Sequence, residues 1–204
     1  MMLDTGLRWR TLCVCLAAGR AGGLEGRTLK TQQLAVVGML AAIAYLLMLA
    51  VKFPIIPGAQ FLKYDPSDAA GLVAGILYGP AAGVAVVAIK DILFLARNPF
   101  GIVADFIAAA TFVGVTSWVY LRGSGGTAPR LLWATVFGIA ARVLVMIPVN
   151  FVILRLQFGM TPERVAGLLL PAIVPFNGLK GLMNAALAFM VVMPLVRRGI
   201  LRAA

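Results

Sequence analysis

The chain has 204 residues, of which 62% are hydrophobic and only 12% are charged. Soluble domains are about half apolar and a quarter charged, so this composition excludes an ordinary soluble protein and predicts a membrane protein. The formal net charge of +11 comes from basic residues that flank apolar segments, which indicates membrane topology rather than nucleic-acid binding. A membrane-spanning helix needs about 20 apolar residues, so the chain holds five or six spans and no separate soluble domain of ordinary size.

Residues 1–30 carry five basic residues around a short apolar run, Leu12–Ala18. This run is too short for a convincing signal sequence, so we interpret residues 1–30 as a basic, disordered extension in the cytoplasm. The extension contains Cys13 and Cys15. One intervening residue is a poor spacing for a disulfide, and the sequence has no histidine to complete a zinc site, so we interpret both cysteines as incidental.

Six apolar segments follow within residues 31–200, which we predict to be one membrane domain. We expect them at about 32–51, 67–78, 81–96, 102–121, 131–154 and 171–196, the last beginning near Pro171 or Pro175. The second segment is short for a full crossing. The second and third segments, joined by a tight turn at Gly79-Pro80, could therefore form a re-entrant hairpin, but we favour six spans. Residues 157–164 are predicted to be a polar loop.

The distribution of lysine and arginine predicts the orientation. Five basic residues lie in the N-terminal tail, two in the linker 122–130 and three in the C-terminal tail, against five in the loops at the other end of the segments. Because basic loops stay in the cytoplasm, both termini are predicted to lie inside. The sequence therefore predicts an all-α, multi-pass protein of the plasma membrane, a compact bundle of six transmembrane helices with an N-in, C-in topology.

Polar side chains inside the apolar segments gather near the predicted outer ends of those segments. Charges at membrane depth are costly and usually face a cavity, a partner or each other, and purely structural polar residues would not be expected at one level. We therefore predict a pocket that faces outward. The residues concerned are Asp65, Asp68, Lys90, Asp91, Asp105, Asn150, Asn177 and Lys180. Arg142, near the middle of the fifth segment, is the exception, and we interpret it as structural or partner-facing.

The last segment shows the clearest local pattern. Asn177, Lys180 and Asn184 are spaced i, i+3 and i+7, so they share one helix face. Amides and an ammonium suit a ligand rich in carbonyls and hydroxyls, and for Asn177 with Lys180 we favour ligand contact. Interhelical hydrogen bonding is the alternative, and for Asn184 the two interpretations stay equal.

Two other positions keep a structural alternative of equal weight. Lys90 with Asp91 could be an internal ion pair that holds two helices, and Asp68 could be a helix cap that pairs with a lysine. Small residues at spacings of four, such as Gly79 with Gly83, allow close helix packing. These faces, which also include Ala35, Gly38, Ala41, Ala42, Ala81 and Ala85, serve either packing within the chain or docking to another membrane protein.

Several catalytic signals are absent from the sequence. It has no histidine, and the glycine-rich run at 123–127 lacks the lysine and spacing of a phosphate-binding loop. There is no Gly-x-Ser-x-Gly elbow either. We therefore predict no catalytic residue, no metal site and no ATP hydrolysis. A membrane protein that binds a ligand but cannot hydrolyse ATP needs a separate protein to drive transport.

The run FLKYDPSDAAGLVAGILYGPAAGVAVVAIKD at residues 61–91 resembles the signature of the S components of energy-coupling factor (ECF) vitamin transporters, most closely the riboflavin-binding type. The resemblance covers about 170 residues, from the first span to the C-terminus. The matching positions are Phe61, Leu62, Lys63, Asp65, Ser67, Asp68, Gly79, Pro80, Gly83 and Lys90. Departures are Ala69-Ala70, where a proline-containing run is more typical, and the basic N-terminal tail.

Two further matches concern the substrate. Residues 175–180, PFNGLK, resemble the start of the last helix in riboflavin-type members, where an Asn and a Lys contact the flavin, and Asn150 resembles a fifth-helix Asn that also contacts it. The resemblance implies riboflavin as a transported ligand, with no cofactor, covered by the loop after the first span. The substrate-binding residues expected are Asn150, Asn177, Lys180, Phe61, Leu62, Asp68 and Lys90.

The resemblance also implies partners: a transmembrane T component, onto which the alanine-rich faces of spans one and three would dock, and two cytoplasmic ATPases. In the family the S component is thought to topple in the membrane to release its substrate inside. The expected function is thus a substrate-binding subunit of an ATP-driven importer that captures riboflavin from outside. The alternatives are an S component for another vitamin or precursor and a non-transport structural membrane protein.

Overall fold

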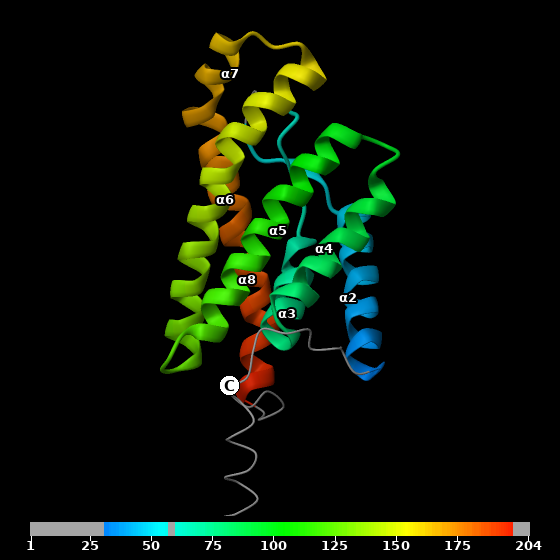
Figure 1. Ribbon diagram of the computed structural model, residues 1–204, viewed down its shortest axis with the longest axis vertical. Helices are drawn as coiled ribbons and strands as arrows, with labels where there is room; N and C mark the ends of the chain where they lie inside the picture. Colours follow the sequence, from blue (N-terminus) through cyan, green and yellow to red (C-terminus); the bar gives the residue numbers. More distant parts are fainter. Residues whose placement is uncertain (1–30, 57–59, 198–204) are drawn as a thin grey trace, which may run out of the picture. The chain divides into compact units, whose positions relative to one another are not determined.

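The computed structural model describes residues 31–56 and 60–197. The predicted N-terminal extension with both cysteines lies outside these ranges. The described residues from 32 onward belong to one compact unit, which is helical apart from one short pair of strands (Figure 1). The elements are α2 (Thr31–Ala50), β1 (Phe53–Pro54), β2 (Lys63–Tyr64), α3 (Asp68–Tyr78), α4 (Pro80–Phe94), α5 (Pro99–Arg122), α6 (Thr127–Phe158), α7 (Pro162–Leu168), η1 (Leu169–Ile173) and α8 (Val174–Arg197).

Among the described residues, four helical runs are long and apolar enough to cross a membrane: α2, α5, α6 and the continuous run α7–η1–α8. By contrast, α3 has 11 residues and α4 has 15, which correspond to about 16 Å and about 22 Å of helix. Both are shorter than the hydrocarbon core of about 30 Å. The length criterion therefore supports four of the six predicted crossings, and α3 and α4 form a shorter hairpin between them.

The turn between α3 and α4 lies where the sequence predicted it. Gly79 has a φ of +104°, in the left-handed range that favours glycine, and Pro80 occupies the first turn of α4, where its missing N–H costs nothing. The predicted polar loop at 157–164 is mostly wrong, because α6 continues to Phe158 and α7 begins at Pro162. Pro148 lies inside α6 without ending it.

The helix ends gather at two opposite levels of the bundle (Figure 1). One level carries the α3–α4 turn, the α5–α6 loop and the end of α8. The other carries the C-terminus of α2, the antiparallel pair β1–β2 and the α4–α5 and α6–α7 connections. We call this second level the pocket end, because the polar residues described below lie there.

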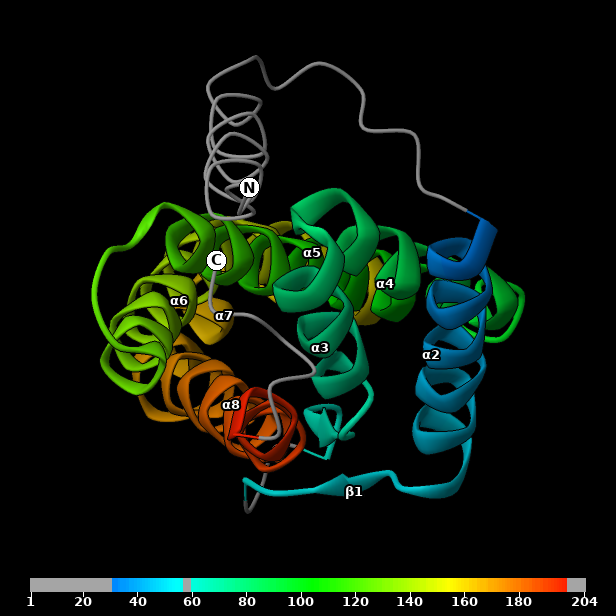
Figure 2. The same ribbon diagram turned by 90° about the horizontal axis from the view of Figure 1, so that it is seen from below.

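The short helix α3 packs against α4, α5 and α8, while α5 also packs on α6 and α6 on α8. Seen from below in Figure 2, α3 lies inside the ring of helices and α2 lies at its edge. Glycine makes the close packing possible. A Cβ on Gly83 of α4 would lie 2.7 Å from the Gly71 carbonyl oxygen of α3 and 2.5 Å from a methyl of Val113 of α5. Gly83 therefore serves packing within the chain.

The hydrophobic core joins α3 to the long helices. It centres on side chains that are fully buried, among them Leu72 of α3, Val87 of α4 and Phe112 of α5. At the pocket end α2 joins the bundle through Met48, which packs with Phe94 and Ile102. Many large apolar side chains elsewhere on α2, α6 and α8 are exposed, as expected where lipid is the solvent.

Candidate functional site

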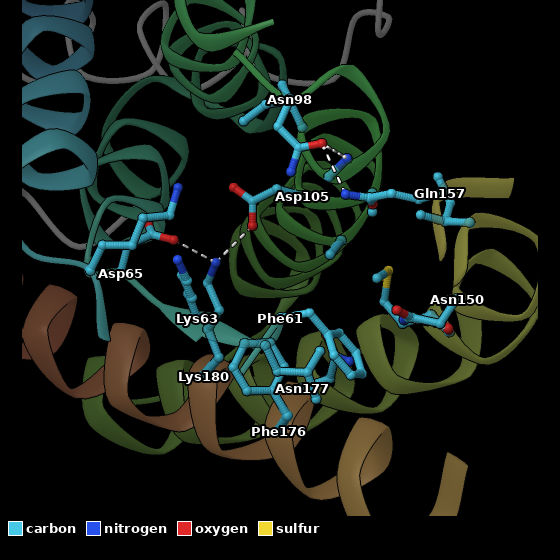
Figure 3. Close-up of a pocket in the computed structure, with 18 of the residues that line it drawn as sticks. Phe61, Lys63, Asp65, Asn98, Asp105, Asn150, Gln157, Phe176, Asn177 and Lys180 are labelled. Carbon is cyan, nitrogen blue, oxygen red and sulfur yellow. Dashed lines mark hydrogen bonds and ion pairs between the residues drawn. The ribbon is translucent and has the colours of Figure 1, made fainter. Parts of the chain in front are cut away.

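A cavity of about 570 Å³ opens at the pocket end and is lined by the loop before α3 and by α2, α5, α6 and α8. Figure 3 shows labelled side chains from the loop before α3, from the start of α5 and from α6 and α8 gathered around it. Its volume lies in the range of small-molecule sites. The lining is mainly apolar, with Phe61, Phe158 and Phe176 among its aromatic side chains, and a few amides and charged groups converge on it.

Lys180 is the centre of the polar part of the cavity. Its Nζ lies 2.8 Å from Asp65 Oδ2 and 2.7 Å from Asp105 Oδ1 (Figure 3), and 4.0 Å from Asp68 Oδ2. The ammonium thus joins α8 to α5 and to the loop that precedes α3. These three carboxylates are close enough together to suggest a metal site, but the lysine already supplies the positive charge between them.

Lys90 of α4 holds a second set of contacts. Its Nζ lies 2.9 Å from Asp105 Oδ2, 3.1 Å from Asp91 Oδ1 and 3.3 Å from Asp68 Oδ1. Asp105 therefore bridges both lysines. The Lys90–Asp91 pair, one of the two alternatives left open by the sequence, is present, but both residues belong to α4, and the contacts that join helices run to Asp68 and Asp105.

Arg142 completes this network, in contrast to its expected place apart from the other polar residues. It is 1% exposed, and its Nη1 lies 2.8 Å from Asp68 Oδ2. Four carboxylates and three cations thus form one network. It connects α3, α4, α5, α6 and α8 with the loop before α3. Buried charges persist in a protein only when they are paired in this way.

Three asparagine side chains near this network, Asn150, Asn177 and Asn184, have different hydrogen-bond partners. Asn150 donates from Nδ2 to the Met146 carbonyl of its own helix, at 2.9 Å. Asn177 donates likewise to the Ile173 carbonyl at 2.9 Å, and its Oδ1 accepts a hydrogen bond from Arg142 Nε at 3.2 Å. Both amides line the cavity.

Asn184 does not line the cavity and ties helices together. Its Oδ1 accepts from the Ala69 N–H at the start of α3, and its Nδ2 donates to the Asp65 carbonyl, both at 3.2 Å. The Ala69 N–H also donates to the Pro66 carbonyl at 3.2 Å, so the Asn184 side chain adds a second acceptor at the start of α3 and connects it to α8. Of the two interpretations left open for Asn184, interhelical hydrogen bonding is the one that these contacts support.

The loop before α3 is fixed to the site through Asp65. Its carboxylate accepts hydrogen bonds from the backbone N–H of Ser67, at 3.2 Å, and from the Ser67 hydroxyl. Burial, the largest single influence, would raise the pKa of this carboxyl, but attraction to the ammonium groups of Lys180 and Lys90 and the hydrogen bond from Lys180 together lower the pKa. Burial raises the pKa of the neighbouring Tyr64 hydroxyl, and the carboxylates of Asp65 and Asp68 raise it further.

One aromatic contact and the hydrogen bonds of one amide connect the end of α6 to its neighbours in the cavity wall. The rings of Phe61 and Phe158 have centroids 5.8 Å apart, which brings the loop next to the end of α6. Asn98 Oδ1 accepts from the Gly101 N–H at 3.1 Å and from Gln157 Nε2 at 3.2 Å (Figure 3). One side chain thus caps α5 and connects its start to the end of α6.

The structure places five of the seven expected substrate-binding residues on the cavity wall: Phe61, Leu62, Asn150, Asn177 and Lys180. The other two, Asp68 and Lys90, do not line it. Both are fully buried and pair with the other charged groups, so their expected direct contact with a ligand stays a prediction, and the structure gives them a position behind the wall. Their spacing in the sequence could not show which charges face the cavity and which face each other.

Several cavity residues were not singled out from the sequence. They include Asn98, Gln157, Phe158 and Phe176. Phe176 had a signal, because it directly precedes Asn177 in the chain. Asn98 and Gln157 had none, since one lies in a predicted inter-helix turn and the other in a predicted polar loop, where polar residues are ordinary.

Comparison with known proteins relates the chain to one family of membrane proteins. Residues 32–192 match the model of the ECF transporter, substrate-specific component. The chain is 34% identical to the riboflavin transporter FmnP of Bacillus subtilis (strain 168), over 76% of its own length and 86% of the relative's. It is 30% identical to the riboflavin transporter RibU of Staphylococcus aureus (strain TCH60), over 75% and 84% of the two lengths.

The fold is similar to that of a solved protein described as the S component of a bacterial ECF transporter. The two share a TM-score of 0.72 and 27% sequence identity, and the similarity covers 83% of this chain and 98% of the other.

Proposed function

Because the chain belongs to the substrate-specific components of ECF transporters, we propose that it captures riboflavin from outside the cell for ATP-driven uptake. Family membership makes the protein a transport subunit of the cell membrane and not an enzyme. It also implies a substrate and an ECF module as partner. The identity of the substrate is the proposed part.

The observation that carries the proposal is the composition of the cavity wall. About 570 Å³ of mainly apolar space carries the amides of Asn150 and Asn177 and the ammonium of Lys180 among its polar side chains, a combination suited to a flat aromatic ligand with several carbonyl groups and ring nitrogens. Two relatives that are at least 30% identical to the chain are named riboflavin transporters.

In the proposed complex, Asn150, Asn177 and Lys180 contact the polar edge of the isoalloxazine ring, and Phe61 and Leu62 cover its apolar surface. Asp68 and Lys90 act indirectly, since they hold Arg142 and Asp105 in place. The loop that contains Asp65 is fixed to Lys180, so ligand and loop share one anchoring residue.

We further propose that the pocket end faces outside and both termini face the cytoplasm. The partners in this proposal are a transmembrane T component and two ATP-binding subunits. Ala35, Gly38 and Ala42 lie on one face of α2 and are exposed, as is Ala81 of α4. These small residues offer a surface on which another membrane helix can approach closely.

Titration of the purified chain in detergent with riboflavin tests the substrate. We expect saturable quenching of the flavin fluorescence at micromolar or lower ligand. A panel of other vitamins serves as the control, because an S component for a different vitamin would bind a member of that panel and leave riboflavin unbound. Absence of binding to any vitamin by a folded chain would support the purely structural alternative.

A further inference from the structure

Arg142 makes an unusual pair of contacts for a residue on the wall of a ligand cavity. It lies in α6, is 1% exposed and lines the cavity. Its Nη1 donates to Asp68 Oδ2 at 2.8 Å, and its Nε donates to Asn177 Oδ1 at 3.2 Å. One guanidinium therefore connects α3 and α8 directly beside the amide that the ligand is proposed to meet.

The chemistry of the guanidinium determines which way that amide points. Arginine has five N–H donors and no acceptor, so only the oxygen of the Asn177 amide can face it. The amide nitrogen must then point the other way, where one of its two N–H groups meets the Ile173 carbonyl. Within residues 31–56 and 60–197, the second N–H has no hydrogen-bond acceptor. Asn177 thus offers the cavity a donor.

The arginine is itself held rigidly. Asp68, which accepts from Arg142, is also 3.3 Å from Lys90 Nζ, and all three side chains are almost completely buried. The planar fork of the guanidinium gives fixed directions to its two hydrogen bonds, which a lysine ammonium cannot reproduce. Lys90, Asp68 and Arg142 therefore form a continuous support that ends at the Asn177 amide.

We propose that Arg142 is a positioning residue that orients Asn177 as a hydrogen-bond donor and so makes the site selective for a carbonyl acceptor on the ligand. This inference rests on the proposed function. Without Arg142 only the hydrogen bond to the Ile173 carbonyl holds the amide, so the amide turns over more easily and offers its oxygen instead. The wild-type orientation favours a ligand that presents a strong acceptor at that point and rejects one that does not.

The test compares riboflavin with 2-thioriboflavin and 4-thioriboflavin, in which one ring carbonyl becomes a weakly accepting thiocarbonyl. We expect the wild-type chain to bind one of the two analogues about three- to tenfold more weakly than riboflavin, the value of one neutral hydrogen bond. In the double variant R142M/D68N this ratio falls toward one. The double variant removes one positive and one negative charge together, so the net charge of the network is unchanged.

The single variant Asn184→Ala is the control for a general loss of stability, because Asn184 bonds neither Arg142 nor Asn177 and does not line the cavity, and it should keep the wild-type ratio. Arg142→Lys provides a second variant if the double variant does not fold. It retains the positive charge but cannot hold both contacts, so its ratio should also fall. A merely structural role for Arg142 would weaken riboflavin and analogue by the same factor.

An unchanged ratio in R142M/D68N or in Arg142→Lys would overturn the inference, as would a wild-type chain that binds riboflavin and both analogues equally. These results leave the proposed substrate intact. A folded wild-type chain that does not bind riboflavin would instead overturn the proposed function, and this inference with it.

Discussion

At the scale of single residues, polar side chains in this protein divide into those that face the cavity and those that face each other. Asn150 and Asn184 show the difference. Asn150 lines the cavity and makes its hydrogen bond within its own helix, whereas Asn184 bonds the start of α3 and the loop before it. Replacing each by alanine should therefore affect different properties.

Asn150→Ala should weaken riboflavin binding about three- to tenfold, because one neutral hydrogen bond contributes roughly 0.5–1.5 kcal/mol. The thermal stability should stay near wild type, since the Met146 carbonyl keeps its place in the helix. Flavin fluorescence titration and thermal unfolding of the unliganded chain in detergent measure the two effects. Full affinity in a folded variant would remove Asn150 from the proposed site.

Asn184→Ala should lower the free energy of unfolding by about 1–3 kcal/mol, the cost of leaving a buried hydrogen-bonding group without its partner. The Asp65 carbonyl loses the Asn184 donor, while the Ala69 N–H keeps its hydrogen bond to the Pro66 carbonyl. Thermal unfolding of the unliganded chain measures the loss. If stability is unchanged and only riboflavin affinity falls, Asn184 belongs to the binding site and the interhelical interpretation is wrong.

At the scale of elements, the α3–α4 hairpin depends on glycine. The two helices are too short to cross a membrane alone, and α3 is buried among α4, α5 and α8. Most of its surface therefore meets protein rather than lipid. The backbones approach closely at Gly71, Gly75 and Gly83, where an added Cβ would lie under 3.0 Å from a neighbouring atom.

Gly83→Ala should destabilise the chain by about 1–3 kcal/mol, as for overpacking in a well-packed core, because its Cβ would collide with the Gly71 carbonyl oxygen. Gly38→Ala on α2 is the matched control. Nothing lies within 4 Å of its Cβ position, so stability should be unchanged. Unfolding in detergent measures both, and equal stability of both variants would contradict the packing role of Gly83.

At the scale of the whole molecule, the two levels of helix ends match the distribution of basic residues. The loop between α5 and α6 and the end of α8 lie opposite the pocket end (Figure 1), and they belong to the more basic side of the sequence. If that side is cytoplasmic, the cavity opens toward the outside, as a capture protein requires.

Single cysteines test this orientation in a background where Cys13 and Cys15 are replaced by serine. Thr161→Cys, in the exposed α6–α7 connection at the pocket end, should react with a membrane-impermeant maleimide in intact cells. Ser124→Cys, in the exposed α5–α6 loop, should react only after the cells are permeabilised. The reverse pattern would mean that the pocket faces the cytoplasm.

The sequence by itself determined the class of protein and most of its helices, because apolar composition and the breaks made by glycine and proline are local properties of the chain. It also identified the family through residues 61–91, and it brought Asn150, Asn177 and Lys180 to one level, since depth follows from counting residues along a helix. It missed α7 and misjudged the length of the loop before it, where local signals were ambiguous.

Only the tertiary structure decided which charge pairs with which. Counting along helices cannot show that Arg142 reaches Asp68 and Asn177, or that Asp68 and Lys90 are turned away from the cavity, because these contacts join residues on different helices. The same limit applied to Asn184, whose two interpretations were equal until its partners were known. Ion pairing and hydrogen bonding between helices depend on rotation and distance, and packing of the whole bundle sets both.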